Sequence, residues 1–307
     1  MKRALPRLAF SLLLTVNAFA QAQRGALVRV ASLYLSPDPK SAKLADIDRG
    51  REVIVLETSR EWLHVEANLT EERTVTGWML QKGVVQVSTP NGDRILYGEA
   101  VDSEDQASQR RGRRGAAQDA MRLYYRVYDL FPNSPLAAQS LYRAADIRWQ
   151  IDRQDVLTRP SARERQAYMR GQIDEEWMKL VIKKFPTTRW ADRAAFHLID
   201  NKLCGDWQGA SKCPEKESDI YEKYVKEHGQ SPDAAEALYQ AAWRQSALIE
   251  IYKSEANQKK SAEAKNRALD LAQRVLSQYG ESDWSLRAQT LLFYVQQGVP
   301  TWGNETQ

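Results

Sequence analysis

FPNSP at Phe131–Pro135, FPTTR at Phe185–Arg189, HGQSP at His228–Pro232 and YGESD at Tyr279–Asp283 decide the fold of this 307-residue chain. Each stretch separates two amphipathic runs. In each, a ring-bearing residue comes first, a proline or glycine interrupts the pattern, and a hydroxyl residue stands three positions after the ring. A helix breaker followed by an N-capping Ser or Thr marks the end of one helix and the start of the next. The sequence therefore predicts four helical hairpins.

The hairpins predict an all-α array over residues 116–298. Its expected N-caps are Ser134, Thr188, Ser231 and Ser282, with Pro135 and Pro232 at the first helical position. The expected helix pairs cover residues 116–130 and 135–152, 171–184 and 189–203, 217–227 and 232–252, and 262–278 and 283–297. Stacked hairpins present an extended surface, which is typical of proteins that bind other proteins.

The amino terminus predicts export. Lys2 and Arg3 precede an apolar stretch over residues 8–16, and Ala18-Phe19-Ala20 offers small residues for cleavage. We interpret residues 1–20 as a signal peptide, with cleavage after Ala22 as a near alternative. An uncleaved anchor is the other alternative, but the apolar stretch is shorter than the ~20 residues of a spanning helix. We expect a periplasmic or secreted protein with no transmembrane segment after cleavage.

Charge and cysteine content agree with this location. The formal charge is +4, and three of the positive charges lie in residues 1–20, so the remainder carries +1 and favours no nucleic-acid partner. In an oxidising compartment, Cys204 and Cys213 are expected to form a disulfide rather than remain free thiols. A metal site is the weaker interpretation, because zinc needs three or four ligands and neither His197 nor His228 is close in sequence. We predict no metal and no cofactor.

Residues 25–87 show a different pattern. Short stretches rich in β-branched and aromatic residues predict strands near residues 27–30, 52–57, 62–66 and 75–79. The order of LYLSPD at residues 33–38, ADIDRG at 45–50, WLHV at 62–65 and GWM at 77–79 resembles a bacterial SH3-like domain. This resemblance implies a small all-β barrel that binds cell-wall peptides or proteins without catalysing a reaction. The candidate ligand-binding residues are Tyr34, Trp62 and Trp78; core packing is the alternative for both tryptophans.

Residues 88–115 lack hydrophobic periodicity. An acidic half, with Glu99, Asp102, Glu104 and Asp105, is followed by the basic run QRRGRRG at residues 109–115. Such a composition buries little apolar area and predicts a flexible charged linker. An alternative is that the arginines of this run dock on an acidic or phosphate-bearing polymer of the envelope.

The hairpins also resemble a known group of repeats. Segments such as YYRVYDLFPNSPLAAQSLYRAADIRWQ (124–150) and YEKYVKEHGQSPDAAEALYQAAWRQ (221–245) are similar to tetratricopeptide-type repeats of periplasmic proteins. Such repeats occur in the lipoprotein of the outer-membrane β-barrel assembly machinery and in the Tol-Pal-associated cell-division coordinator. The resemblance favours an envelope protein partner. On a concave face built from first helices, the expected partner-binding residues are Arg122, Tyr125, Arg126, Trp177 and Lys179.

No pattern in the sequence predicts an active site. The three histidines are dispersed, neither cysteine stands beside a base at a helix start, and there is no GxSxG elbow or phosphate-binding glycine loop. We expect a non-enzymatic scaffold or adaptor whose repeats bind a protein while the barrel contacts peptidoglycan or a second protein. Two alternatives are a regulatory subunit that activates a cell-wall hydrolase in trans, and a structural envelope protein that self-associates.

Overall fold

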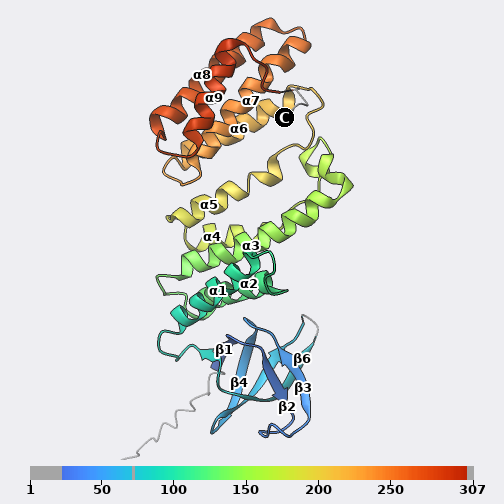
Figure 1. Cartoon of the computed structure of the whole chain (residues 1–307), viewed down its shortest axis with the longest axis vertical. Coiled ribbons are helices and arrows are strands. Elements are labelled where there is room, and N and C mark those ends of the chain that lie inside the picture. The colour runs from blue at the N-terminus through green and yellow to red at the C-terminus, as the bar shows by residue number, and fades with distance from the viewer. Residues whose placement is uncertain (1–22, 71–72, 303–307) are drawn as a thin grey trace, which may run out of the picture.

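The computed structural model describes residues 23–70 and 73–302 (Figure 1). The expected signal peptide at residues 1–20 lies outside the described residues. The molecule is elongated, with a β domain at one end and helices stacked along the long axis. A β domain followed by a helical array matches the coarse prediction from the sequence.

The β domain is one antiparallel sheet with the strand order β3-β2-β6-β5-β4-β1-β7. Side chains alternate between its faces, so that Leu63, Val65 and Ala67 of β5 enter the core while Trp62 and His64 lie on the other face. The strands are β1 (Gln23–Leu27), β2 (Ala31–Tyr34), β3 (Lys43–Ile47), β4 (Glu52–Ser59), β5 (Trp62–Asn68), β6 (Thr74–Leu80) and β7 (Val84–Gln86).

The four predicted turns fall at helix ends. Each of α2, α4, α6 and α8 ends one residue before the ring-bearing residue of its turn. In all four turns the hydroxyl residue donates its backbone N–H to the carbonyl of that ring-bearing residue, three positions earlier. The helices are α1 (Gly92–Ser108), α2 (Ala116–Leu130), α3 (Ala137–Thr158), α4 (Glu176–Lys184), α5 (Arg189–His197), α6 (Lys212–Glu227), α7 (Ala234–Ser254), α8 (Gln258–Gln278) and α9 (Trp284–Gln297).

The predicted caps need a correction. Of the four predicted hydroxyl caps, only Thr188 is an N-cap, accepting a hydrogen bond from the backbone N–H of Ala191 at the start of α5. Helices α3 and α7 begin at Ala137 and Ala234, two residues after the prolines, because a further turn comes first. In those turns the hydroxyls of Ser134 and Ser231 accept from the second N–H after them. The Ser282 hydroxyl instead donates to the Tyr279 carbonyl.

The predicted flexible linker is wrong, because most of it forms α1. Its buried stripe consists of Leu96, Ala100 and Ser103, spaced by four and three residues, and it packs against α2. The acidic side chains that suggested a tether make specific contacts: Glu99 pairs with Arg49 of the β domain, and Glu104 accepts a hydrogen bond from the Tyr124 hydroxyl at 2.8 Å. Burial of small residues and these polar contacts stabilise a segment that has little apolar area.

The β domain is attached firmly to the array. Arg24 of β1 pairs with Asp129 of α2 at 2.5 Å, and Arg126 of α2 reaches back to Glu52 of β4 at 3.1 Å. The Arg122 side chain donates to the Arg49 carbonyl at 2.9 Å. The two modules therefore share a close interface rather than a tether.

The predicted disulfide between Cys204 and Cys213 is confirmed. It closes the loop between α5 and α6, and this loop is held by Glu217, which is 1% exposed. The Glu217 carboxylate accepts hydrogen bonds from the Cys204 backbone N–H at 2.8 Å and the Trp207 indole at 3.3 Å, and it pairs with Arg244 of α7 at 2.7 Å. Among the described residues, no helix is long and apolar enough to cross a membrane.

Candidate functional site: an aromatic face and a helical groove

The outer face of the β domain gathers the three residues predicted to bind a ligand. Tyr34 lies opposite Trp78 in the pairing of β2 with β6, and Trp78 lies opposite His64 in the pairing of β6 with β5. The Trp78 ring stacks on His64 at 4.8 Å, and Tyr34 meets Trp62 edge-on at 5.9 Å. We call these four residues the aromatic face. His64 was missed as a member because its role depends on strand register.

The aromatic face is available to a ligand. Trp62 is almost completely buried beneath its neighbours, while Tyr34, His64 and Trp78 are half-buried. The face is carried by β2, β6 and β5, whereas the helices pack against β1 and β7 at the other end of the strand order. Leu80, on the same side of β6 as Trp78, is 43% exposed. A surface with several rings and exposed apolar atoms is a typical ligand-binding surface.

The structure does not bring the five predicted partner-binding residues of the array into one open surface. Arg122 and Arg126 contact the β domain. Tyr125 stacks on Trp177 at 4.7 Å, which joins the first hairpin to the second. Lys179 is exposed and pairs with Glu175 of the preceding turn at 2.7 Å. Most of this set is occupied by contacts within the chain.

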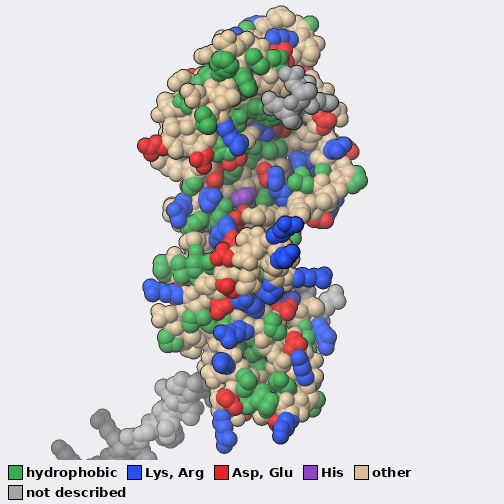
Figure 2. All heavy atoms as spheres, viewed as in Figure 1, with side chains coloured by type: hydrophobic (Ala, Val, Ile, Leu, Met, Phe, Trp, Pro, Cys, Tyr) green, Lys and Arg blue, Asp and Glu red, His purple; other side chains and the backbone are tan. Residues whose placement is uncertain are grey.

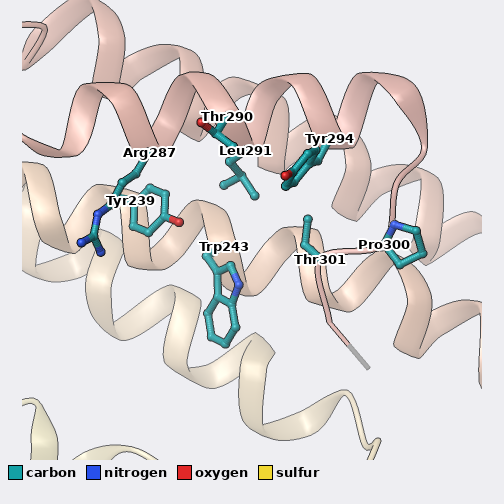
Figure 3. A pocket seen from close by; sticks show the side chains of 8 residues that line it. All are labelled: Tyr239, Trp243, Arg287, Thr290, Leu291, Tyr294, Pro300 and Thr301. Atoms are coloured by element: carbon teal, nitrogen blue, oxygen red, sulfur yellow. The ribbon is translucent and has the colours of Figure 1, made fainter. Parts of the chain in front are cut away.

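A groove between α7 and α9, which no local sequence pattern indicates, offers another surface (Figure 3). It has a volume of about 310 Å³. Figure 3 shows Arg287 and Tyr239 at one end, Trp243 and Leu291 in the middle, and Tyr294 beside the segment that carries Pro300 and Thr301. The lining residues are Tyr239 and Trp243 of α7, Arg287, Thr290, Leu291 and Tyr294 of α9, and Pro300 and Thr301. The two α7 residues have i, i+4 spacing, and three of the α9 residues (Arg287, Leu291 and Tyr294) have i, i+4, i+7 spacing, so each set lies on one side of its helix.

The groove combines aromatic walls with one cation. The Arg287 guanidinium lies over the Trp284 ring at 4.6 Å. Burial raises the pKa of the Tyr239 hydroxyl and also that of the Glu236 carboxyl, one turn earlier on α7. Among residues 23–70 and 73–302, no carboxylate makes a direct ion pair with Arg287, but the Arg287 charge acts on the Glu236 carboxyl and opposes part of the rise in its pKa. The groove thus has a cationic end and an aromatic end.

The other polar cluster, around His197, consists of packing contacts within the chain. His197, the last residue of α5, contacts two side chains of α3: the Tyr142 hydroxyl at 3.2 Å and the Asp146 carboxylate at 3.5 Å. Burial lowers the pKa of the His197 imidazole. Within the part of the chain that the structure describes, no group of three or more His, Cys, Asp or Glu side chains is placed to hold a metal ion.

Charges of both signs are mixed on the surface. Figure 2 shows Lys, Arg, Asp and Glu side chains interspersed along one face of the molecule, without an extended field of one sign. A protein that follows a nucleic-acid backbone needs a basic stripe or patch, and this view displays none.

No protein-family model matches the chain, and no curated protein does. Among solved structures, it is similar to two titled "DHF58 filament" and "DHF79 filament". The first is 16% identical, has a TM-score of 0.24, and the match covers 67% of this chain and 91% of the other. The second is 14% identical, has a TM-score of 0.19, and the match covers 65% and 95%. Similarity this low supports no argument about fold or function.

Proposed function

We propose that this protein is a non-enzymatic scaffold of the cell envelope, with an SH3-like β domain that contacts peptidoglycan and tetratricopeptide-like hairpins that bind a protein partner. The observation that carries the proposal is the aromatic face, which presents three half-buried rings on β2, β5 and β6, whereas the main helix contacts are made by β1 and β7. Rings of this kind stack on apolar faces of ligands while their polar edges donate hydrogen bonds. The disulfide supports a location in an oxidising compartment.

Sedimentation with purified peptidoglycan tests the proposal. The chain from Gln23 to Gln307 should pellet with the polymer at moderate salt, and Trp78→Ala should reduce its affinity by about tenfold, equivalent to one stacking contact. Thr76→Ala is the matched control, because Thr76 is exposed on the same side of β6 two residues earlier. Circular dichroism of both variants would show whether the sheet is intact. Absence of pelleting would refute wall binding, and equal pelleting by Trp78→Ala would refute the role of the aromatic face in it.

Self-association is a second candidate function, favoured by the outer side of α9. Leu286 and Phe293, seven residues apart on this last described hairpin, are 70% and 57% exposed. Light scattering over a hundredfold range of concentration would detect an assembly. A Phe293→Lys variant should remain a monomer if the α9 surface is the contact, and an unchanged mass for the unmodified chain over the range would exclude this candidate.

A further inference from the structure

We propose that the groove between α7 and α9 binds an extended peptide segment in which an acidic residue stands three positions from an aliphatic or aromatic residue. The acidic side chain would pair with Arg287, and the apolar side chain would lie against Trp243 and Tyr294. This inference rests on the proposed function, in which the array binds a protein, and it names the segment that the array recognises.

The spacing follows from the helix that carries both contacts. Arg287 and Tyr294 are seven residues apart on α9, which corresponds to ~10.5 Å along the helix axis. A peptide in the extended polyproline II conformation advances ~3.1 Å per residue and has three residues per turn, so two of its side chains three positions apart lie on one side and are separated by ~9.3 Å. Figure 3 places the two side chains at opposite ends of the groove, with Leu291 between them. A ligand lying along α9 in this conformation can therefore contact both ends when its acidic and apolar residues have this separation.

Charge supports an acidic residue at the Arg287 end. A guanidinium forms charge-assisted, often bidentate hydrogen bonds with a carboxylate. Arg287 is exposed and makes no direct ion pair with the described residues, so a ligand carboxylate can reach it, while its charge also acts on the half-buried Glu236 carboxyl of α7. Its position over the Trp284 ring fixes its orientation. A single cation in a small groove suits one carboxylate, whereas an anionic polymer or membrane surface would require several basic residues.

The middle of the groove and the segment at its far end are held in place before a ligand arrives. Trp243 packs against Trp207 of the disulfide-bonded loop at 5.3 Å, and the Arg244 guanidinium lies 5.5 Å from the Trp243 ring. The Thr301 hydroxyl is 2.7 Å from that of Ser246, which fastens the segment after α9 to α7. Because these contacts exist without a ligand, little ordering is required on binding.

Peptide selection tests the proposal directly. A phage-displayed library of random dodecapeptides would be panned against the chain from Gln23 to Gln307. We expect enrichment of peptides with Asp or Glu three positions from Leu, Ile, Phe, Tyr or Trp. A fluorescein-labelled copy of the most enriched peptide should bind Arg287→Gln at least tenfold more weakly, whereas Arg274→Gln should bind unchanged. Arg274 is the matched control, because it lies on α8 and lines a different surface.

A double-mutant cycle identifies the contact. Replacing the acidic residue of the peptide by its amide should weaken binding to the unmodified protein and should have little further effect on Arg287→Gln. Thr290→Trp fills the groove from its α9 wall while leaving Arg287, Trp243 and Tyr294 unchanged, and it should abolish binding. Enrichment without an acidic residue, equal binding by Arg287→Gln, or the absence of any enriched peptide would each overturn the inference. If the protein sediments with peptidoglycan but binds no such peptide, this inference alone is overturned. If it binds the peptide but does not sediment with peptidoglycan, only wall binding is overturned.

Discussion

Substitution of Glu217 by Gln should destabilise the α6–α7 hairpin and the loop that precedes it. The Glu217 and Arg244 side chains are 1% and 7% exposed, and their atoms approach to 2.7 Å. Removing one partner of such a buried ion pair usually costs about 3–5 kcal/mol, because the remaining charge loses its compensation. Arg244 would keep two hydrogen bonds to Gln240, at 3.2 and 2.8 Å. We therefore expect the lower end of that range, about 3 kcal/mol.

Urea unfolding followed by far-ultraviolet circular dichroism would measure the change in the free energy of unfolding. Hydrogen exchange adds a local measurement, because the Cys204 N–H donates to Glu217 and should lose protection if that bond weakens. Glu227→Gln is the matched control on the same helix. Its partner Lys223 lies at 3.8 Å, and both side chains are more than half exposed, so the expected change is below about 0.5 kcal/mol.

A cost below about 1 kcal/mol for Glu217→Gln, the net value of an ordinary hydrogen bond, would contradict the role of Glu217 in compensating the buried Arg244 charge. A second variant separates loss of charge compensation from loss of packing. Combining Glu217→Gln with Arg244→Met removes the buried charge as well, and it should recover at least ~1 kcal/mol relative to Glu217→Gln alone. If the double variant is less stable than the single one, the arginine contributes mainly through its contacts with surrounding rings.

Three further outcomes are expected. Replacing Cys204 and Cys213 by Ser should cost about 2–3 kcal/mol by loop entropy, measured by urea unfolding, and should weaken peptide binding in the α7–α9 groove. Gly50→Ala should destabilise the docked β domain more than Gly83→Ala, as measured by thermal unfolding. Both glycines have positive φ angles, but a Cβ added at Gly50 would clash with the Arg122 Cβ at 2.5 Å, whereas a Cβ added at Gly83 would lie 3.9 Å from the Arg29 Cβ, an ordinary contact distance. Burial lowers the pKa of His197 below its ordinary 6.5. As the pH decreases below about 6.5, the unfolded chain gains a proton that the folded chain excludes, so stability should fall. His197→Asn should flatten that slope between pH 7 and 5.5, and an unchanged slope would contradict the assignment.

The hairpins could be predicted from the sequence because their boundaries depend on local chemistry. A proline or glycine after Phe131, Phe185, His228 or Tyr279 ends a helix whatever packs around it. The disulfide was predictable for a similar reason, since Cys204 and Cys213 are close in sequence and the chain contains no other cysteines. By contrast, α1 was missed because its buried stripe uses Ala100 and Ser103, which contribute little to hydrophobic periodicity.

The candidate sites depend more on long-range register. Tyr34, Trp62 and Trp78 were selected as separate aromatic residues, and the pairing of β2, β6 and β5 brings them together with His64. The predicted partner-binding residues of the array do not form one surface, because Arg122 and Arg126 lie against the β domain. Their partners in that domain are over 70 positions earlier in the chain, so no local sequence pattern predicts the contact. The α7–α9 groove likewise combines helices and a terminal segment, whose approach no local pattern predicts.

Firm docking of the β domain changes how the two proposed surfaces would act together. A flexible linker would let the array sample many positions around a wall contact, with an effective concentration that falls as the linker lengthens. The Arg24–Asp129 and Arg126–Glu52 pairs instead fix the β domain against α2. In Figure 1 the β domain and α7–α9 lie toward opposite ends of the long axis. A partner bound in the groove would therefore be held at a distance from the wall that is set by the stacking of the hairpins. Because several of these interface charges are partly exposed, high salt should weaken the docking and with it this control of distance.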